Sequence, residues 1–213
     1  GGPGGPGGRR GPFGMGPPDQ VYQWKVFCLD LTTGKVLWEQ LAFEGKPTIG
    51  IEQSNTYASQ TPLADGERVY AYFGMTGIFC FDHTGKPLWN KDLGSYPVMF
   101  GPGSSPAMDD ERVFVQCDND EKSFLVALNK KTGDEVWRAE RDERSNYSTP
   151  YLWKNKVRTE LVTCGSTVRS YDPATGEIHW EYRNFGGGVK PTAVCDWRSA
   201  VTEPAGAVGG GGS

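Results

Sequence analysis

Histidine is scarce in this chain, and its cysteines do not pair in sequence. There are two histidines, His83 and His179, and five cysteines with no Cys-x-x-Cys and no adjacent Cys-Cys pair. Two isolated histidines do not make a Ser-His-Asp set or a pair of metal ligands, and this cysteine spacing excludes a zinc knuckle and a dithiol redox motif. We therefore expect structural roles for both histidines. Four cysteines lie in apolar runs, where free thiols behave as small buried hydrophobic groups: Cys28, Cys80, Cys117 and Cys164.

The chain also lacks a basic excess and a long hydrophobic run. Its net charge of -4 disfavours a nucleic acid or an anionic membrane as partner, because both require a basic surface. No apolar stretch is long enough for a transmembrane helix, and no signal peptide is visible. We expect no nucleic-acid partner and no direct membrane span.

Both ends of the chain are poor in residues that build a core. Glycine and proline dominate residues 1–19, and glycine dominates residues 198–213. Such segments cannot bury enough surface to offset the entropy of ordering the backbone, so we expect two disordered tails around a folded region at residues 20–197. Both tails look like places where a longer protein was cut or a linker was joined.

Four related segments recur along the folded region. They read CLDLTTGKVLW, CFDHTGKPLW, ALNKKTGDEVW and YDPATGEIHW, and their tryptophans are spaced by 51, 48 and 43 residues. A second marker keeps the same rhythm, with spacings of 44, 44 and 41: Thr61-Pro62, Ser105-Pro106, Thr149-Pro150 and Lys190-Pro191. A repeat of this length indicates a propeller or a solenoid.

Each repeat consists of short runs with the composition of β-strands. The third unit reads SSPAM, ERVFVQC, SFLVALN and DEVWRAE, separated by turns rich in Asp, Asn and Gly, and no segment shows a sustained helical period. Four antiparallel strands per unit predict an all-β fold, a β-propeller with about four blades present. The Asp and Gly of each motif are expected to close the hairpin between the third and fourth strands.

The motif resembles the tryptophan-docking motif of pyrroloquinoline-quinone (PQQ) type propellers, over about residues 21 to 195. The matching positions in the first copy are Cys28, Asp30, Thr33, Gly34, Lys35 and Trp38; the copies ending at Trp137 and Trp180 match similarly, and the copy ending at Trp89 is one residue shorter. The phrases SNTYAS, DGERVYAYFGMTG, CDNDEKSFLVAL and STPYLWKNKVRTELVTCG look like a BamB-like subgroup common in planctomycete-type bacteria. The resemblance implies that each tryptophan stacks on the glycine turn of the next blade. Trp24 lies outside the motif, and we expect its replacement to cost less stability.

The resemblance implies two different functions. BamB-like relatives are non-catalytic scaffolds that act in assembling outer-membrane β-barrels, which implies a periplasmic or cell-envelope location and a protein or peptide partner.

Quinoprotein dehydrogenases of the same fold hold PQQ over calcium, using carboxylates, an amide, an Asp base, an Arg and often an adjacent Cys pair. This chain has no such pair, and its acids lie mostly in turns or in mixed-charge runs such as DERVF, AERDER and DNDEK, where we expect a solvated surface. We therefore predict a non-enzymatic scaffold without cofactor or metal; a dehydrogenase fragment and a carbohydrate or small-ligand binder are the alternatives.

Two connections between blades, SNTYASQTP and SNYSTP, resemble one another and are expected to line one face of the propeller. Asn55, Tyr57, Asn146 and Tyr147 could offer amides and rings to a peptide there. The favoured alternative is that the Asn and Ser side chains bond the backbone of their own loops.

The number of blades leaves two architectures open. Three units have all four strands, the first unit contributes its last two, and a fifth begins at VKPTAVC before the repeat ends. We favour an open arc over a four-bladed ring in which the strand near Val189 completes the first blade. Because an open arc exposes strand edges and apolar faces, we expect the chain to self-associate or to be elongated.

Overall fold

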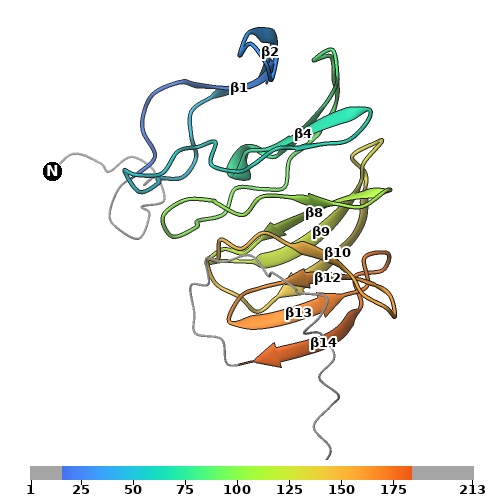
Figure 1. Cartoon of the computed structure of the whole chain (residues 1–213). Helices are drawn as coiled ribbons and strands as arrows, with labels where there is room; N and C mark the ends of the chain where they lie inside the picture. The colour runs from blue at the N-terminus through green and yellow to red at the C-terminus, as the bar shows by residue number, and fades with distance from the viewer. Residues whose placement is uncertain (1–15, 184–213) are drawn as a thin grey trace, which may run out of the picture.

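The computed structural model describes residues 16–183, which form β-sheets stacked face to face (Figure 1). Apart from one 3-10 turn, η1 (Gly74–Thr76), every regular element in this range is a β-strand. Of the two predicted tails, only residues 16–19 fall within this range. Residues 198–213 and the predicted fifth blade, with Cys195, lie outside it.

The strands form one two-stranded and three four-stranded antiparallel sheets, each in sequence order. Blade one contains β1 (Tyr22–Leu29) and β2 (Val36–Gly45), and blade two contains β3 (Leu63–Ala64), β4 (Arg68–Tyr72), β5 (Ile78–Asp82) and β6 (Pro87–Lys91). Blade three contains β7 (Ala107–Met108), β8 (Arg112–Cys117), β9 (Ser123–Asn129) and β10 (Glu135–Arg141). Blade four contains β11 (Tyr151–Lys154), β12 (Thr159–Thr163), β13 (Thr167–Tyr171) and β14 (Ile178–Arg183). The predicted partial β-propeller is confirmed.

The core lies between the blades, so a central strand is apolar on both faces. In β9 the run from Ser123 to Leu128 is buried. Phe124 and Val126 pack in the cluster shared with blade two, whereas Leu125 and Ala127 pack with blade four. The period-two alternation of a strand therefore divides one apolar run between two interfaces.

The motif turns close the hairpins as predicted. Asp30 and Asp172 accept backbone N–H groups of their own turns through Oδ1. The turn glycines have positive φ, from 69° at Gly34 to 84° at Gly85, a conformation that glycine adopts without a steric penalty.

The motif tryptophans join successive blades. Trp89 donates its indole N–H to the carbonyl of Lys130 at 3.1 Å, and its ring lies so close to Gly133 that a Cβ there would approach it to 2.6 Å. The same arrangement joins Trp38 to blade two and Trp137 to blade four. The docking that the resemblance implied is therefore present at all three blade junctions of the described residues, including the turn of the shorter copy.

The second sequence marker forms a chain of hydrogen bonds across the blades. The N–H of Thr61 donates to Ser105 Oγ at 2.9 Å, and the N–H of Ser105 donates to Thr149 Oγ1 at 3.1 Å. The 44-residue spacing thus places each hydroxyl beside the equivalent backbone position of the preceding blade. Lys190-Pro191 lies outside the described residues.

The surroundings of Trp24 argue against the expectation that it matters less to stability than the motif tryptophans. Trp24 is 3% exposed, packs against Phe43 and Tyr57, and donates its indole N–H to the carbonyl of Tyr57 at 2.9 Å. Alternation along β1 places Trp24 and Val26 on the face that packs against blade two. Trp24 is a core residue of the first junction without belonging to the motif.

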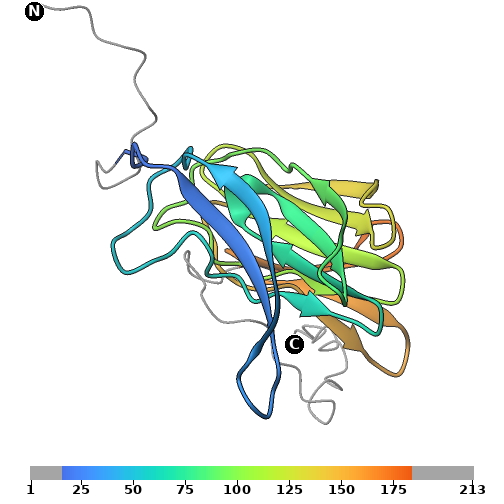
Figure 2. The ribbon, with the colours of Figure 1, turned by 90° about the horizontal axis from the view of Figure 1, so that it is seen from above.

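The described residues form an open arc. The sheet of β1 and β2 and the strand β14 lie at opposite ends of the stack (Figure 1), and successive sheets are turned relative to one another (Figure 2). The four-bladed ring is not formed within residues 16–183, and the strand near Val189 that it required lies outside them.

Candidate functional site

The two loop asparagines connect blades to one another. Asn55 donates through Nδ2 to the carbonyl of Phe100 at 2.7 Å, and Asn146 donates through Nδ2 to the carbonyl of Cys164 at 3.0 Å. Their Oδ1 atoms accept N–H groups of their own loops. The Oδ1 bonds fit the favoured alternative of bonding within the loop, and the Nδ2 bonds go further by fixing each loop to another segment.

The two loop tyrosines are also held, in different surroundings. The Tyr57 hydroxyl donates to the carbonyl of Ile49 at 2.9 Å, while its ring packs in the core beside Trp24. The Tyr147 hydroxyl donates to the carbonyl of Met99, and burial, with a contribution from Asp120, raises the pKa of Tyr147 to about 12. Tyr147 therefore remains a hydrogen-bond donor at neutral pH.

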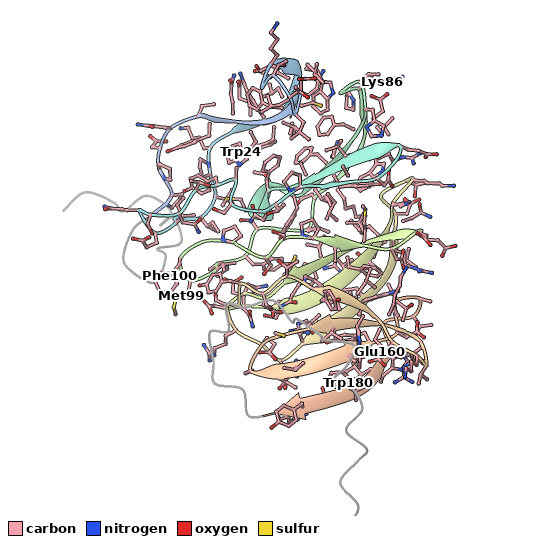
Figure 3. The ribbon with its side chains drawn as sticks, in the orientation of Figure 1. Trp24, Lys86, Met99, Phe100, Glu160 and Trp180 are labelled. Atoms are coloured by element: carbon pink, nitrogen blue, oxygen red, sulfur yellow. The ribbon has the colours of Figure 1, made fainter. Side chains whose placement is uncertain are left out.

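Met99, Phe100 and Tyr147, which we call the rim cluster, lie where the connections between blades meet at the edge of the arc. Met99 is 39% exposed, and the rings of Phe100 and Tyr147 are 6.4 Å apart. Figure 3 shows Met99 and Phe100 at the outer edge of the molecule, beyond the strands. Phe100 has φ 68°, the one positive φ of a non-glycine residue in the described range, and Asn55 anchors its carbonyl. Strained backbone of this kind is concentrated at functional sites and requires support from its surroundings.

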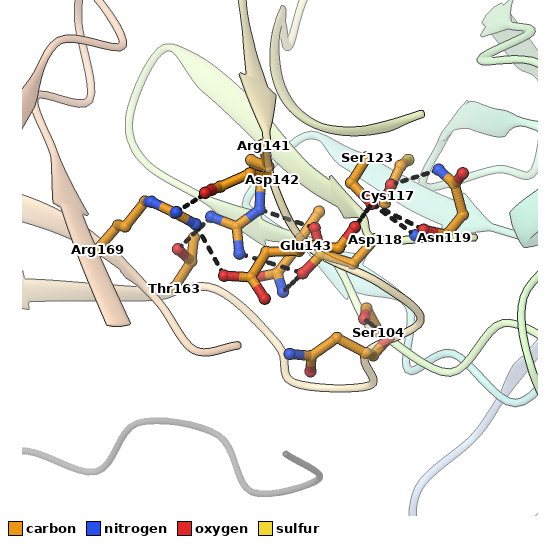
Figure 4. A network of polar contacts seen from close by, with 12 residues as sticks. Ser104, Cys117, Asp118, Asn119, Ser123, Arg141, Asp142, Glu143, Thr163 and Arg169 are labelled. Carbon is orange, nitrogen blue, oxygen red and sulfur yellow. Dashed lines mark hydrogen bonds and ion pairs between the residues drawn. The ribbon is translucent and has the colours of Figure 1, made fainter. Parts of the chain in front are cut away.

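A buried polar network links blades three and four (Figure 4). Arg141 donates through Nε and Nη2 to Asp118, at 2.7 and 3.1 Å, and both side chains are fully buried. Arg141 also donates to Thr163 and Tyr171 of blade four. Burial disfavours the charged guanidinium, but Asp118 outweighs this effect and holds the pKa of Arg141 above its usual value.

A second ion pair extends this network. Glu143 accepts a hydrogen bond from Arg169 Nη1 at 2.8 Å and further bonds from the N–H groups of Ser166 and Thr167. The expectation that the acids of AERDER and DNDEK are solvated is therefore wrong for Glu143 and Asp118. Both acids lie just past a strand end, Asp118 after β8 and Glu143 after β10, at the interface between blades three and four. They are buried there because each pairs with an arginine, Asp118 with Arg141 and Glu143 with Arg169.

The described residues do not fit PQQ and its calcium ion. The cavity beside the network, lined by Gln116, Asp118, Tyr72 and Asn146 among others, has a volume of about 30 Å³. This is room for water rather than a fused-ring quinone. The nearby carboxylates of Asp118 and Glu143 are already bound by arginines, and residues 16–183 contain no group of three or more His, Cys, Asp or Glu side chains arranged for a metal.

A wider groove of about 470 Å³ lies between blades one and two. Its walls combine apolar side chains, such as Phe43 and Phe79, with the polar side chains of Asn90 and Asp92. Thr48 and Ser95 share a hydrogen bond between their hydroxyls at one side. The volume and mixed lining are those of a small-ligand site.

The two histidines and the four cysteines of the described residues lie in the hairpin turns and strands of the blades. His83 accepts the indole N–H of Trp38 through its backbone carbonyl, and His179 lies 3.9 Å from Asp172. Cys80 and Cys164 are buried, whereas Cys28 and Cys117 are partly buried, and all four are free thiols. Burial raises the pKa of Cys80 and of Cys117 to about 12, so neither is a thiolate at neutral pH. Within residues 16–183, no helix is long and apolar enough to cross a membrane.

Comparisons with known proteins place this geometry among propellers of one type. A family model described as outer membrane protein assembly factor BamB matches residues 23–183. Solved structures that resemble the chain include BamB from Moraxella catarrhalis, with 17% identity, TM-score 0.45 and coverage of 75% of this chain and 58% of that one. Quinohemoprotein alcohol dehydrogenase from Comamonas testosteroni matches with 20% identity, TM-score 0.47 and coverage of 59% and 21%. The corresponding enzyme ADHIIG from Pseudomonas putida HK5 matches with 14% identity, TM-score 0.49 and coverage of 75% and 31%.

The chain spans less than two thirds of the length of each of these three structures. A comparison with curated proteins finds no significant match.

Proposed function

Because the chain belongs to the PQQ-like propeller family described as outer membrane protein assembly factor BamB, we propose that it is a non-catalytic scaffold for protein interaction. The family description points to assembly of outer-membrane proteins, and so to a place in the cell envelope. The chemistry of the network agrees with this proposal, since Asp118 and Glu143 neutralise buried arginines and lock blade three to blade four.

The rim cluster is the observation that carries the proposal. Its side chains are a methionine and two aromatic rings, residue types enriched at protein interfaces, and methionine adapts its shape to varied partners. The positive φ of Phe100 is a costly backbone conformation for an aromatic residue, and hydrogen bonds of Asn55 and Gly101 hold the loop around it. A partner that is an extended, alternating segment of an outer-membrane protein would present apolar side chains to this cluster.

A peptide-binding experiment tests this role. The probe is a fluorescent synthetic peptide corresponding to one transmembrane β-strand of an outer-membrane protein, and the control peptide has the same composition in scrambled order. We expect Phe100→Asn to weaken binding about tenfold or more. Because asparagine tolerates the left-handed conformation, the variant should keep its thermal midpoint.

Val157→Ser is the matched control, because Val157 is 85% exposed and lies outside the rim cluster. It should leave binding unchanged. Equal affinity of the wild type for both peptides, or equal binding by Phe100→Asn and Val157→Ser, would contradict the proposal.

The groove between blades one and two supports a second candidate, a small-ligand or carbohydrate site. Aromatic rings beside amide and carboxylate groups suit a sugar, which offers an apolar face and hydroxyls. Asn90→Ala and Asp92→Ala should each abolish saturable binding of a saccharide detected by calorimetry. A wild-type chain that binds no member of a panel of neutral and acidic oligosaccharides would remove this candidate.

A further inference from the structure

Two buried glutamines, Gln60 and Gln116, carry amide atoms without a hydrogen-bond partner among the described residues. Gln60 is 8% exposed and lacks a partner at both Oε1 and Nε2, and Gln116 is 1% exposed and lacks one at Oε1. A buried polar atom that stays unpaired costs its full desolvation free energy, and nearly all such atoms in folded proteins are paired with protein groups or with ordered water. We therefore expect a partner for each of these atoms.

The amide of Gln116 has a fixed orientation. Its Nε2 lies 2.7 Å from Asp118 Oδ2, 3.2 Å from Ser148 Oγ and 3.1 Å from the carbonyl oxygen of Cys164. Exchanging the nitrogen and the oxygen would turn Oε1 onto a carboxylate and a carbonyl, which are acceptors themselves. Oε1 therefore points away from these groups, and Gln116 lines the cavity of about 30 Å³ at the junction of blades two and three.

Gln60 approaches the same cavity from the connection that leads into blade two. A Cβ at Gly74 would lie 3.6 Å from Gln60 Nε2 and 2.4 Å from the ring of Pro102. Both Gly74 and Pro102 line the cavity. The unpaired atoms of the two glutamines thus belong to one small region.

The residues equivalent to Gln60 in the next two blades are bonded directly. Gln60, Ser104 and Ser148 each precede a copy of the Ser/Thr-Pro marker. Ser104 Oγ donates to the carbonyl of Asn146 at 3.3 Å, and Ser148 Oγ donates to the carbonyl of Cys164 at 2.6 Å. Within residues 16–183, Gln60 makes no such bond, which leaves its place to a bridging group.

The cavity suits water better than an ion. A cavity needs roughly 10 to 15 Å³ for each water, so one of about 30 Å³ has room for about two. The charge of Asp118 at its wall is already balanced by Arg141. Water both donates and accepts hydrogen bonds, as the unpaired oxygen and nitrogen atoms of the glutamines require.

We propose that this cavity is a structural hydration site, in which about two ordered waters bond Gln60 and Gln116 and connect blade two to blade three. Buried waters of this kind make about three hydrogen bonds each and are costly to remove. Val98 and Pro102, which flank Met99 and Phe100 in the chain, line the cavity, so the waters adjoin the loop that carries part of the rim cluster. The inference does not depend on the proposed function.

Gln60→Met tests the proposal, because methionine keeps the length of the side chain and removes both amide atoms. If those atoms have no partner, the change removes a cost of burial and raises the thermal midpoint. If water pairs with them, the change removes a hydrogen-bonded bridge, and we expect the thermal midpoint to fall by roughly 2 to 4 °C. Oxygen-17 magnetic relaxation dispersion of the 213-residue chain, which counts long-lived internal waters, should show a lower number for the variant than for the wild type.

Gln53→Met is the matched control, because Gln53 is exposed in the same connection between blades one and two. It makes the same chemical change away from the cavity, and should keep the thermal midpoint and the number of long-lived waters of the wild type. A Gln60→Met variant that melts at or above the wild-type temperature, or that keeps as many long-lived waters as Gln53→Met, would overturn the proposal.

Discussion

At the scale of single residues, the blade junctions depend on glycines that serve two purposes. Each turn glycine adopts a positive φ, and at three of the four turns it also leaves room for an indole ring. Gly34 allows the two roles to be measured separately. Within residues 16–183 it adopts a positive φ but has no indole ring beside it.

The paired variants Gly133→Asn and Gly34→Asn measure the steric role. Gly133→Asn places a Cβ 2.6 Å from Trp89 and should lower the free energy of unfolding by about 1 to 3 kcal/mol. Gly34→Asn has a similar φ and no such contact, so its stability should remain near that of the wild type. Urea denaturation at a concentration where the chain is monomeric gives both values, and equal losses would show that backbone conformation alone accounts for the motif.

Asp118 and Arg141 form a buried ion pair. We therefore predict a large loss of stability when one of the two side chains is removed. Asp118→Ala leaves the guanidinium without its carboxylate in a fully buried position, and should lower the free energy of unfolding by about 3 to 5 kcal/mol. Glu140→Ala, which breaks the exposed pair with Lys122, should have little effect. Similar urea midpoints for the two variants would contradict the role of Asp118 as an internal lock.

The lowered pKa of Asp65 predicts that the stability of the fold depends on pH. Burial opposes ionisation of Asp65, but Lys130 and two backbone N–H groups outweigh it and lower its pKa from 3.8 to about 2. Because the folded pKa lies below the unfolded pKa, the carboxylate stabilises the fold above about pH 4, and this contribution disappears as the pH falls toward 2. Thermal melts should show that the wild type exceeds Asp65→Asn in stability near neutral pH and that the difference shrinks between pH 4 and 2; a constant difference would contradict the pKa.

At the scale of elements, the strands and turns were predicted from local periods and fixed spacings, and the docking of the tryptophans was implied by the family resemblance. The spacing of the Ser/Thr-Pro marker was visible, but its bonds between blades were not, since a hydroxyl and an N–H separated by 44 residues meet only in the folded arc. The burial of Asp118 and Glu143 was missed because their arginine partners, more than 20 residues away in the sequence, meet them only in the folded arc. The burial of Trp24 was not predicted, because the motif was considered without the alternation of β1. Of the rim cluster, the sequence singled out Tyr147 but not Met99 or Phe100, because the contact of Met99 with Tyr147, 48 residues away, forms only in the folded arc.

At the scale of the whole molecule, the arc combines rigid junctions with surfaces available to partners. Indole docking, the hydroxyl chain and the buried ion pairs fix each blade on the next. The rim cluster lies outside those junctions. Asp118 and Glu143 pair with Arg141 and Arg169 and hold blades three and four together. Our proposal of a scaffold rather than a quinoprotein enzyme depends on these carboxylates being committed to arginines.

Titration of the chain with PQQ in excess calcium tests this claim most directly. A ligand bound specifically to the native state must raise the thermal midpoint, and the quinone absorbance should change on binding. We predict no saturable change in either signal, since the carboxylates are committed to arginines and the cavity beside them, of about 30 Å³, has room for water only. A saturable rise in the thermal midpoint with a submillimolar midpoint in PQQ would contradict it.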